Sequence, residues 1–165
     1  MSDDHHPSTF DSARFRQVLG HFPTGVVVVA AVDDGEPVGL AIGSFASVSL
    51  DPPLVGFFPD RASTSWPRIE KAGSFAVNIL GEHQEDICRT FAARGSDKFA
   101  TIGWKPGHSG SPIIDDVIAW IDCEIEAVVE AGDHFLVTGK VLDLEVAEEG
   151  GPLLFFRGGY GRLAL

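Results

Sequence analysis

A run of uncharged, mostly β-branched residues constrains the fold of this chain more than any other feature of its sequence. The run covers residues 24–32, and its longest fully apolar part, 26–32, has the length of a strand. It predicts a strand buried on both faces, because β-branched side chains favour the pleated backbone and no charge needs water. Asp33-Asp34-Gly35 follows as a turn signal, so residues 36–45 are expected to return as its hairpin partner.

Further strand patterns follow, each bounded by turn residues, and they outnumber the helical patterns. Strands are predicted over 54–58, 74–80, 117–131, 135–146 and 153–156. Gly132-Asp133, between the two longest, predicts a tight II′-like turn. Short helices are predicted from Ser12 to about Gly20 or Pro23, over 63–72 and over 82–93. We therefore expect a mostly β fold, an antiparallel barrel with a few short flanking helices, rather than a doubly wound sheet.

Length and composition indicate one domain. The chain has 165 residues, of which 44% are hydrophobic and 22% charged, the balance of an ordinary globular protein. No repeat or linker interrupts it, so residues 10–165 are expected to form a single domain. The polar opening, residues 1–9, which includes His5 and His6, is expected to be a loose tail.

Charge and the missing targeting patterns exclude several classes of partner. With 12 Lys and Arg against 24 Asp and Glu, the net charge of −12 repels nucleic acid and anionic lipid, so neither is expected as a partner. No apolar run approaches the roughly 18 residues of a membrane helix and no leader pattern is seen, so a cytoplasmic protein is expected. Cys88 and Cys123 lack metal-ligand spacing. We expect buried thiols, with one disulfide as the alternative, and no metal site.

Two segments offer groups that could hold an anion. Residues 43–47, Gly-Ser-Phe-Ala-Ser, would let a ligand approach the backbone closely. Residues 60–65, Asp-Arg-Ala-Ser-Thr-Ser, lead into a predicted helix start, where free N–H groups, hydroxyls and Arg61 suit a phosphate. The alternative interpretation of the second segment is a helix cap beside an exposed arginine.

His134 and Lys98 are the remaining candidates. His134 follows Asp133 at a hairpin tip, where it is either a hydrogen-bond or proton donor at a cleft or an exposed turn histidine. Lys98, beside Phe99, is otherwise a surface charge. The nucleophile-elbow, zinc-protease, P-loop and dinucleotide-binding patterns are missing. The residues alone thus predict a β-barrel that binds a phosphorylated small molecule.

Six short segments, in order along the chain, form a more specific pattern. They are Phe22-Pro23-Thr24-Gly25-Val26, the run 44–54 (Ser-Phe-Ala-Ser-Val-Ser-Leu-Asp-Pro-Pro-Leu), Phe75-Ala76-Val77-Asn78-Ile79-Leu80, Asp97-Lys98-Phe99, Gly132-Asp133-His134 and Arg157-Gly158-Gly159-Tyr160. Together they resemble the flavin reductase family with the FMN-binding split-barrel fold, particularly the reductase components of two-component flavin monooxygenases. The resemblance covers about residues 15–162.

The resemblance implies a cofactor set and a site. It implies FMN or FAD as the flavin and NADH or NADPH as the hydride donor, with NADH preferred because no separate basic cluster is evident for a 2′-phosphate. The cofactor-binding positions that it implies are Ala41, Ile42, Gly43, Ser44, Pro59, Asp60, Arg61, Ser63, Thr64, Ser65, Phe91, Lys98 and Tyr160. It places His134 near the nicotinamide as the catalytic residue. The cofactors carry the hydride from nicotinamide C4 to flavin N5, so the protein mainly holds these atoms about 3–3.5 Å apart.

The resemblance also implies partners, and the chain departs from it in two places. A homodimer and a separate oxygenase that receives reduced flavin are expected. Where many relatives have Thr-Ala-Asn-Ser, this chain has Ala41-Ile42-Gly43-Ser44, which removes two possible hydrogen bonds to the flavin, and Ala62 replaces a frequent serine. Two other functions stay open: a flavoprotein whose tightly bound flavin acts on another substrate, and a non-catalytic flavin-binding protein.

Overall fold

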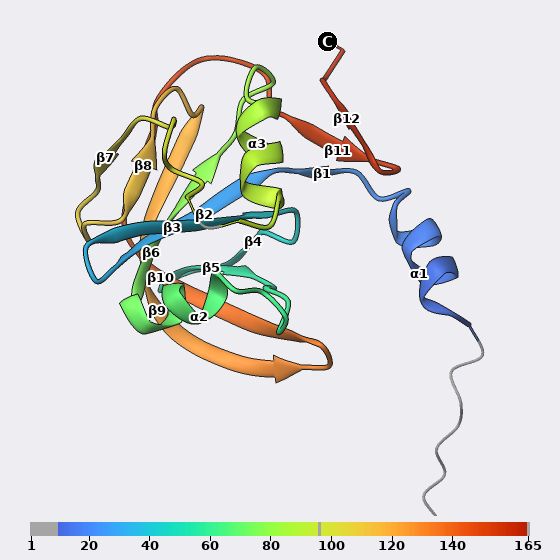
Figure 1. Ribbon diagram of the computed structural model, residues 1–165, viewed down its shortest axis with the longest axis horizontal. Coiled ribbons are helices and arrows are strands. Elements are labelled where there is room, and N and C mark those ends of the chain that lie inside the picture. Colours follow the sequence, from blue (N-terminus) through green and yellow to red (C-terminus); the bar gives the residue numbers. More distant parts are fainter. Residues whose placement is uncertain (1–9, 96, 165) are drawn as a thin grey trace, which may run out of the picture.

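The prediction of a mostly β, antiparallel fold is confirmed by the computed structural model, which describes residues 10–95 and 97–164 (Figure 1). The tail predicted for residues 1–9 lies outside the described residues. The strands are β1 (Thr24–Gly25), β2 (Val27–Asp33), β3 (Glu36–Ile42), β4 (Ala46–Leu50), β5 (Pro53–Phe57), β6 (Ser74–Ile79), β7 (Trp104–Pro106), β8 (Pro112–Ile114), β9 (Ala119–Ala131), β10 (His134–Val146), β11 (Leu154–Phe156) and β12 (Gly159–Gly161). The helices are α1 (Ser12–Leu19), α2 (Trp66–Ala72) and α3 (Glu85–Ala92).

The main sheet has the strand order β3-β2-β6-β9-β10-β5-β4, with every neighbouring pair antiparallel. Its largest unit is the long β9–β10 hairpin, in which Ala131 pairs with His134. Gly132 has φ +63° in the intervening turn, as the predicted II′-like geometry requires of its first residue. This hairpin therefore fixes His134 at the start of a long, regular strand.

The first hairpin forms as predicted, although its boundaries differ. Asp33 pairs with Glu36, and Asp34 and Gly35 both have positive φ, which gives a two-residue turn. The predicted strand 24–32 is divided at Val26 because β1 leaves the main sheet to pair with β11. The predicted run 36–45 ends at Ile42, and the chain then starts the edge strand β4, which was not predicted as a separate strand.

Burial on both faces of β2 is confirmed, and it divides the core in two. Val27, Val29 and Ala31 belong to a cluster shared with Trp66 and Ile69 of α2. Val26, Val28 and Ala30 belong to a second cluster that includes Cys88 and Phe91 of α3. Helices α2 and α3 thus pack on opposite faces of the sheet, and β3, at its edge, contacts both.

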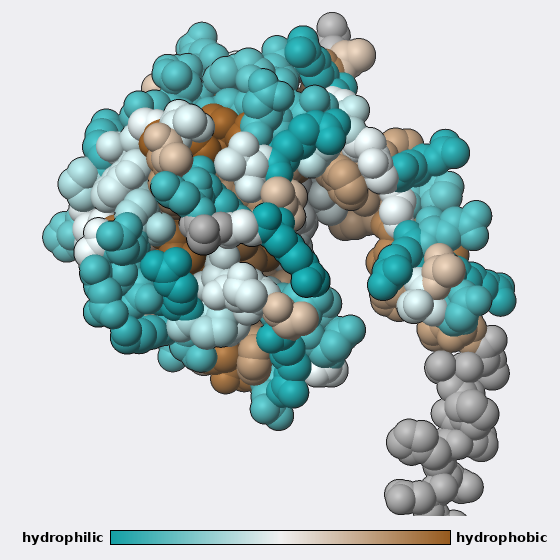
Figure 2. Space-filling view, viewed as in Figure 1, coloured by the Kyte–Doolittle hydropathy of each residue, from teal (hydrophilic) through white to brown (hydrophobic). Residues whose placement is uncertain are grey.

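Helix α1 differs from the other two because it buries none of its residues. It begins where predicted: Asp11 caps it by accepting a hydrogen bond from the Arg14 backbone N–H at 2.8 Å. Its apolar side chains are nevertheless more than half exposed, namely Phe15, Val18 and Leu19. Figure 1 shows that α1 stands apart from the body of the protein and is joined to it through β1. Figure 2 shows apolar surface on this projecting part of the chain.

Both cysteines are free and buried, as predicted, so the disulfide alternative is wrong. Cys123 is fully buried among the strands, and burial next to Asp122 raises the pKa of its thiol to about 12. Within the described residues, the helices are too short or too polar to cross a bilayer.

Candidate functional site

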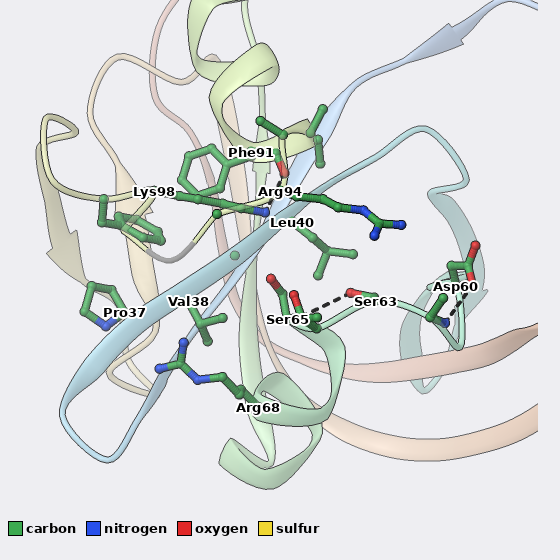
Figure 3. A pocket seen from close by; sticks show the side chains of 18 residues that line it. Pro37, Val38, Leu40, Asp60, Ser63, Ser65, Arg68, Phe91, Arg94 and Lys98 are labelled. Atoms are coloured by element: carbon green, nitrogen blue, oxygen red, sulfur yellow. Dashed lines mark hydrogen bonds between the residues drawn. The ribbon is translucent and has the colours of Figure 1, made fainter.

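A pocket of about 830 Å³ lies over β3 between the segment that leads into α2 and the end of α3 (Figure 3). We call it the α2–α3 pocket. Strand β3 supplies its floor over residues 37–41. One wall is formed by Asp60, residues 62–65 and Arg68, and the other by residues 91–95 with Lys98 and Phe99. The pocket gathers seven of the residues predicted from the sequence: Ala41, Asp60, Ser63, Thr64, Ser65, Phe91 and Lys98.

Hydroxyl groups line the α2 side of this pocket, but they do not belong to a helix. The helix predicted over 63–72 begins only at Trp66. The hydroxyl oxygen of Ser63 accepts hydrogen bonds from the backbone N–H groups of Ser65 (3.3 Å) and Trp66 (3.1 Å), so its own hydrogen is free to donate. Ser65 is 8% exposed and makes no capping hydrogen bond, and Figure 3 shows it beside the cavity. This wall therefore offers donors to an anion.

Cationic groups face these hydroxyls. Lys98 donates a hydrogen bond from Nζ to the Phe91 carbonyl oxygen at 2.9 Å, and desolvation lowers the pKa of its ammonium group. Figure 3 shows Arg94 extending from the end of α3 across the pocket toward the side that carries Ser63. Arg94 was not predicted from the sequence. It lies two residues beyond the end of α3, in the loop that leads to Lys98, and no local pattern marks it as a pocket residue.

Gly39 allows α3 to lie close to the floor of the pocket. A Cβ atom at this position would lie 2.9 Å from Cε1 of Phe91 and 3.2 Å from the Val29 carbonyl oxygen. Phe91 is 1% exposed and packs edge-to-face on Phe99, with the ring centroids 4.9 Å apart. A side chain at position 39 would push this aromatic pair outward, so the glycine shapes the wall beside Lys98.

His134 lies at the Asp60 end of the pocket without lining it. Residues 60 and 134 form an isolated antiparallel bridge, and the backbone N–H of Arg61 donates to the Asp133 carbonyl oxygen at 3.0 Å. Nδ1 of His134 lies 2.7 Å from Oδ1 of Asp133, and this hydrogen bond lowers the pKa of the Asp133 carboxyl. Because an ionised carboxylate only accepts, Nδ1 carries the proton and Nε2 is left free.

Two predicted positions next to Asp60 are held by the β9–β10 hairpin instead of lining the pocket. Arg61 pairs with Glu130 at 2.7 Å, and its guanidinium lies 5.0 Å from the centroid of the Phe135 ring. The Pro59 carbonyl oxygen accepts a hydrogen bond from the Phe135 N–H at 2.9 Å. The arginine in the predicted phosphate segment thus points away from the pocket, because a carboxylate and an aromatic face on the neighbouring hairpin attract it.

The predicted segment 41–44 is divided between two pockets. Ala41 lines the α2–α3 pocket, and Ile42 is buried in the core. Gly43 and Ser44 line a second, mostly apolar pocket of about 750 Å³ beside β1, which we call the β1 pocket. The Ser44 hydroxyl is already engaged with the Phe58 backbone, accepting from its N–H at 3.1 Å and donating to its carbonyl oxygen at 3.3 Å.

Tyr160 lines neither pocket. Its hydroxyl lies 3.3 Å from Sγ of Cys88, and the guanidinium of Arg89 lies 4.8 Å from the centroid of its ring. The hydrogen bond with Cys88 and desolvation raise the pKa of Tyr160 to about 12. The structure therefore places Tyr160 against the side of α3, away from the cations of the α2–α3 pocket.

Comparison with known proteins places the chain in a family. Residues 19–164 match the family described as flavin reductase like domain. The chain is 54% identical over 158 residues to a flavin reductase of Pseudomonas putida, covering 95% of this chain and 93% of that protein. It is 49% identical over 150 residues to the reductase subunit of a flavin-dependent monooxygenase of Rhodococcus jostii, covering 91% of this chain and 77% of that protein.

A solved structure agrees with the sequence matches. The NADH:FAD oxidoreductase of Streptomyces globisporus C-1027, in complex with NAD and FAD fragments, superposes with a TM-score of 0.88 at 37% identity over 93% of each chain. This similarity confirms the prediction of a split barrel. The family match and the level of identity lead to one conclusion: the chain belongs to the flavin reductase like domain family.

Proposed function

We propose that this protein is an NAD(P)H-dependent flavin reductase that binds FMN or FAD in the α2–α3 pocket and supplies reduced flavin to a separate monooxygenase. The observation that carries the proposal is the facing arrangement of hydroxyl and cationic side chains, Ser63 and Ser65 against Arg94 and Lys98, beside the His134 hairpin. Such a pair of walls suits a phosphate. Ser65 is 8% exposed and makes no side-chain capping bond to α2, so its hydroxyl is available to donate to such an anion.

The chain's own residues would bind and orient the two cofactors. The flavin and the nicotinamide supply the chemistry, a hydride transfer from nicotinamide C4 to flavin N5. Lys98 and Arg94 would hold the flavin phosphate, and the Ser63 and Ser65 hydroxyls would complete its hydrogen bonds. His134, with Nδ1 held by Asp133, would present Nε2 to the nicotinamide at the Asp60 end. NADH is preferred over NADPH as the hydride donor. The cations of the pocket are assigned to the flavin phosphate and not to the 2′-phosphate that distinguishes NADPH.

The direct test is oxidation of NADH by the purified protein with and without added FMN or FAD, followed by the loss of NADH absorbance. We expect oxidation that depends on flavin and saturates in both substrates. Tight, stoichiometric flavin retained through purification with slow turnover of free flavin would indicate a prosthetic group instead. Flavin binding without oxidation of NADH or NADPH would refute the reductase proposal and leave a binding protein.

Replacing Lys98 by glutamine is expected to raise the Kd for FMN about tenfold, because one charge-assisted hydrogen bond of about 1.5 kcal/mol is lost. The wild-type affinity should also fall as the pH rises through the lowered pKa of Lys98, below its ordinary value of 10.5, since only the ammonium form attracts phosphate. Titration calorimetry over a pH series measures both effects.

Two variants control this experiment. Lys98→Arg keeps a cation at every accessible pH and should remove the alkaline loss of affinity. Lys105→Gln removes an exposed charge on β7, outside both pockets, and should leave the Kd unchanged. An equal change in Lys98→Gln and Lys105→Gln would mean that only the net charge of the protein matters and that Lys98 does not contact the flavin.

We further propose that the protein is a homodimer in which α1 packs against a second copy of the chain. An isolated helix of eight residues is marginal in water, so α1 needs a surface to pack on. It buries no residue against its own chain, and its exposed apolar side chains continue to Phe22, which lines the β1 pocket. A second copy would cover this continuous apolar surface.

Val18→Glu is expected to shift the protein from dimer to monomer at micromolar concentration, because it places a charge in the middle of the apolar face of α1. Light scattering coupled to size exclusion measures the mass. Gln17→Glu adds the same charge to the same helix at a position outside the apolar face and should stay dimeric. A wild type with the mass of one chain would contradict the dimer, and a dimeric Val18→Glu variant would contradict the role of α1.

The proposed reductase activity also implies a partner enzyme and a cellular compartment. A reductase whose relative is the reductase subunit of a flavin-dependent monooxygenase requires an oxygenase that consumes reduced flavin. We place the protein in the cytoplasm, where reduced nicotinamide is available.

A further inference from the structure

The end of the β9–β10 hairpin that carries His134 extends past the strands on either side of it. β9 pairs with β6 only as far as Glu124, and β10 pairs with β5 only from Val137 onward. Residues 126–136 are therefore a ribbon of two strands, which is marginally stable on its own. Figure 1 shows its turn, in orange, at the lower right of the body of the protein. The position of His134 thus depends on what holds this end to the rest of the protein.

The segment that precedes the hydroxyl wall of the α2–α3 pocket holds this end of the hairpin. The Phe135 N–H donates to the Pro59 carbonyl oxygen at 2.9 Å, and the Arg61 N–H donates to the Asp133 carbonyl oxygen at 3.0 Å. Within the described residues, these are the backbone hydrogen bonds that join residues 126–136 to the rest of the protein. The wall of the pocket and the turn that carries the histidine are thereby attached to each other.

The side chain of Arg61 adds two contacts at the same junction. Its guanidinium lies 2.7 Å from Oε1 of Glu130 and 5.0 Å from the centroid of the Phe135 ring. Glu130 and Phe135 are directly opposite in β9 and β10, so one side chain contacts both strands of the ribbon. At exposed positions, an ion pair and a cation–π contact each change an equilibrium about two- to fivefold. A change of this size matters for a ribbon that opens at little cost.

Arg61 cannot act by touching the nicotinamide that we assign to His134. Neighbouring residues of a strand point to opposite faces, so Phe135 and the guanidinium over its ring lie on the face away from the imidazole. Arg61 does not line the α2–α3 pocket either. Any effect of its side chain on the reaction therefore passes through the position of the hairpin.

We propose that Arg61 is a positioning residue, whose contacts with Glu130 and Phe135 hold the end of the β9–β10 hairpin against the pocket and so keep His134 where it meets the nicotinamide. The inference rests on the proposed function and on the role of His134 in it. Without these contacts the hairpin is docked in only a fraction of the molecules, and the apparent affinity for NADH falls by that fraction. Saturating NADH restores docking, so KM rises while kcat is retained.

Two measurements test the proposal. Hydrogen exchange of the Phe135 N–H, followed by NMR in the flavin-free protein, reports the docking of the hairpin, and steady-state kinetics with varied NADH report its consequence. We expect Arg61→Gln to raise both the exchange rate and the KM for NADH about fivefold, and Glu130→Gln about threefold, with kcat and the flavin Kd unchanged. The double variant should match Arg61→Gln, because the two substitutions remove the same ion pair.

Arg89→Gln is the matched control. Arg89 also pairs with a glutamate, with Nε 3.5 Å from Oε2 of Glu85, and its guanidinium also lies over an aromatic ring, 4.8 Å from the centroid of Tyr160. These contacts are on α3 and β12, away from the hairpin. Arg89→Gln should therefore leave the Phe135 exchange rate and the KM for NADH as in wild type.

Three results would overturn the positioning role. The first is an unchanged Phe135 exchange rate in Arg61→Gln, and the second is faster exchange with an unchanged KM. The third is a raised KM in Arg61→Gln but not in Glu130→Gln, which would mean that Arg61 contacts the NADH phosphates directly. If wild type does not oxidise NADH, the proposed function fails, and the exchange rates still decide whether Arg61 holds the hairpin.

Discussion

Replacing His134 by alanine is expected to lower kcat/KM for NADH roughly 10- to 100-fold while the Kd for flavin stays unchanged. The effect arises from orientation, since a misplaced reactant can cost about two orders of magnitude in rate. We assign this orientation to His134 because its backbone bridges to Asp60 at the end of the pocket and its Nδ1 is held by Asp133. Steady-state kinetics with varied NADH and a flavin titration of the same variant measure the two quantities.

Two further variants make the result specific. Asp133→Asn removes the carboxylate that holds Nδ1 of His134 and should cause a smaller loss of kcat/KM. His108→Ala removes a histidine between β7 and β8, outside both pockets, and should behave as wild type. If His134→Ala keeps both its rate and its KM for the nicotinamide, His134 is an exposed turn histidine and the orienting group lies elsewhere.

The longer strands were predictable because each carries its own local pattern. The uncharged run of β2, the turn at Asp34 and Gly35, and the turn at Gly132 all agree with the structure. Strands β7 and β8 were missed, since three residues each in a glycine-rich stretch show no period. The side chain of Asn78 in β6 makes hydrogen bonds to Pro112 and Ile114 of β8, a long-range contact that no local pattern reveals.

The candidate site was predictable as a set of segments but not as a set of side-chain directions. Ser63, Ser65 and Lys98 reach one pocket because the loop before α2 and the loop after α3 converge over β3. Arg61 belongs to a predicted segment and still points away, because Glu130 and Phe135 of a distant hairpin compete for it. Arg94, in the loop after α3, lines the pocket in its place. Sequence spacing sets which face of an element a residue occupies, whereas its partner depends on tertiary packing.

Asn78 shows the same dependence on tertiary packing at the level of stability. The residue is fully buried in β6, and its side chain joins three strands. Its Nδ2 donates to the carbonyl oxygens of Pro112 (3.0 Å) and Val28 (3.3 Å), and its Oδ1 accepts from the Ile114 N–H at 2.8 Å. Two of these bonds satisfy buried backbone groups of β8, and the third satisfies the Val28 carbonyl oxygen of β2.

Asn78→Leu is therefore expected to lower the free energy of unfolding by about 2–4 kcal/mol, because leucine keeps the volume but leaves buried backbone groups without partners. Urea unfolding followed by fluorescence measures the change. Thr90→Val, which removes one exposed hydrogen bond to the Asp86 carbonyl oxygen on α3, should stay within about 0.5 kcal/mol of wild type. Since Asn78 lines neither pocket, the folded fraction of Asn78→Leu should bind flavin with the wild-type Kd. An unchanged unfolding midpoint would show that β8 and β2 satisfy these groups without Asn78, and a changed flavin Kd in the folded variant would show that the β7–β8 sheet helps to shape the site.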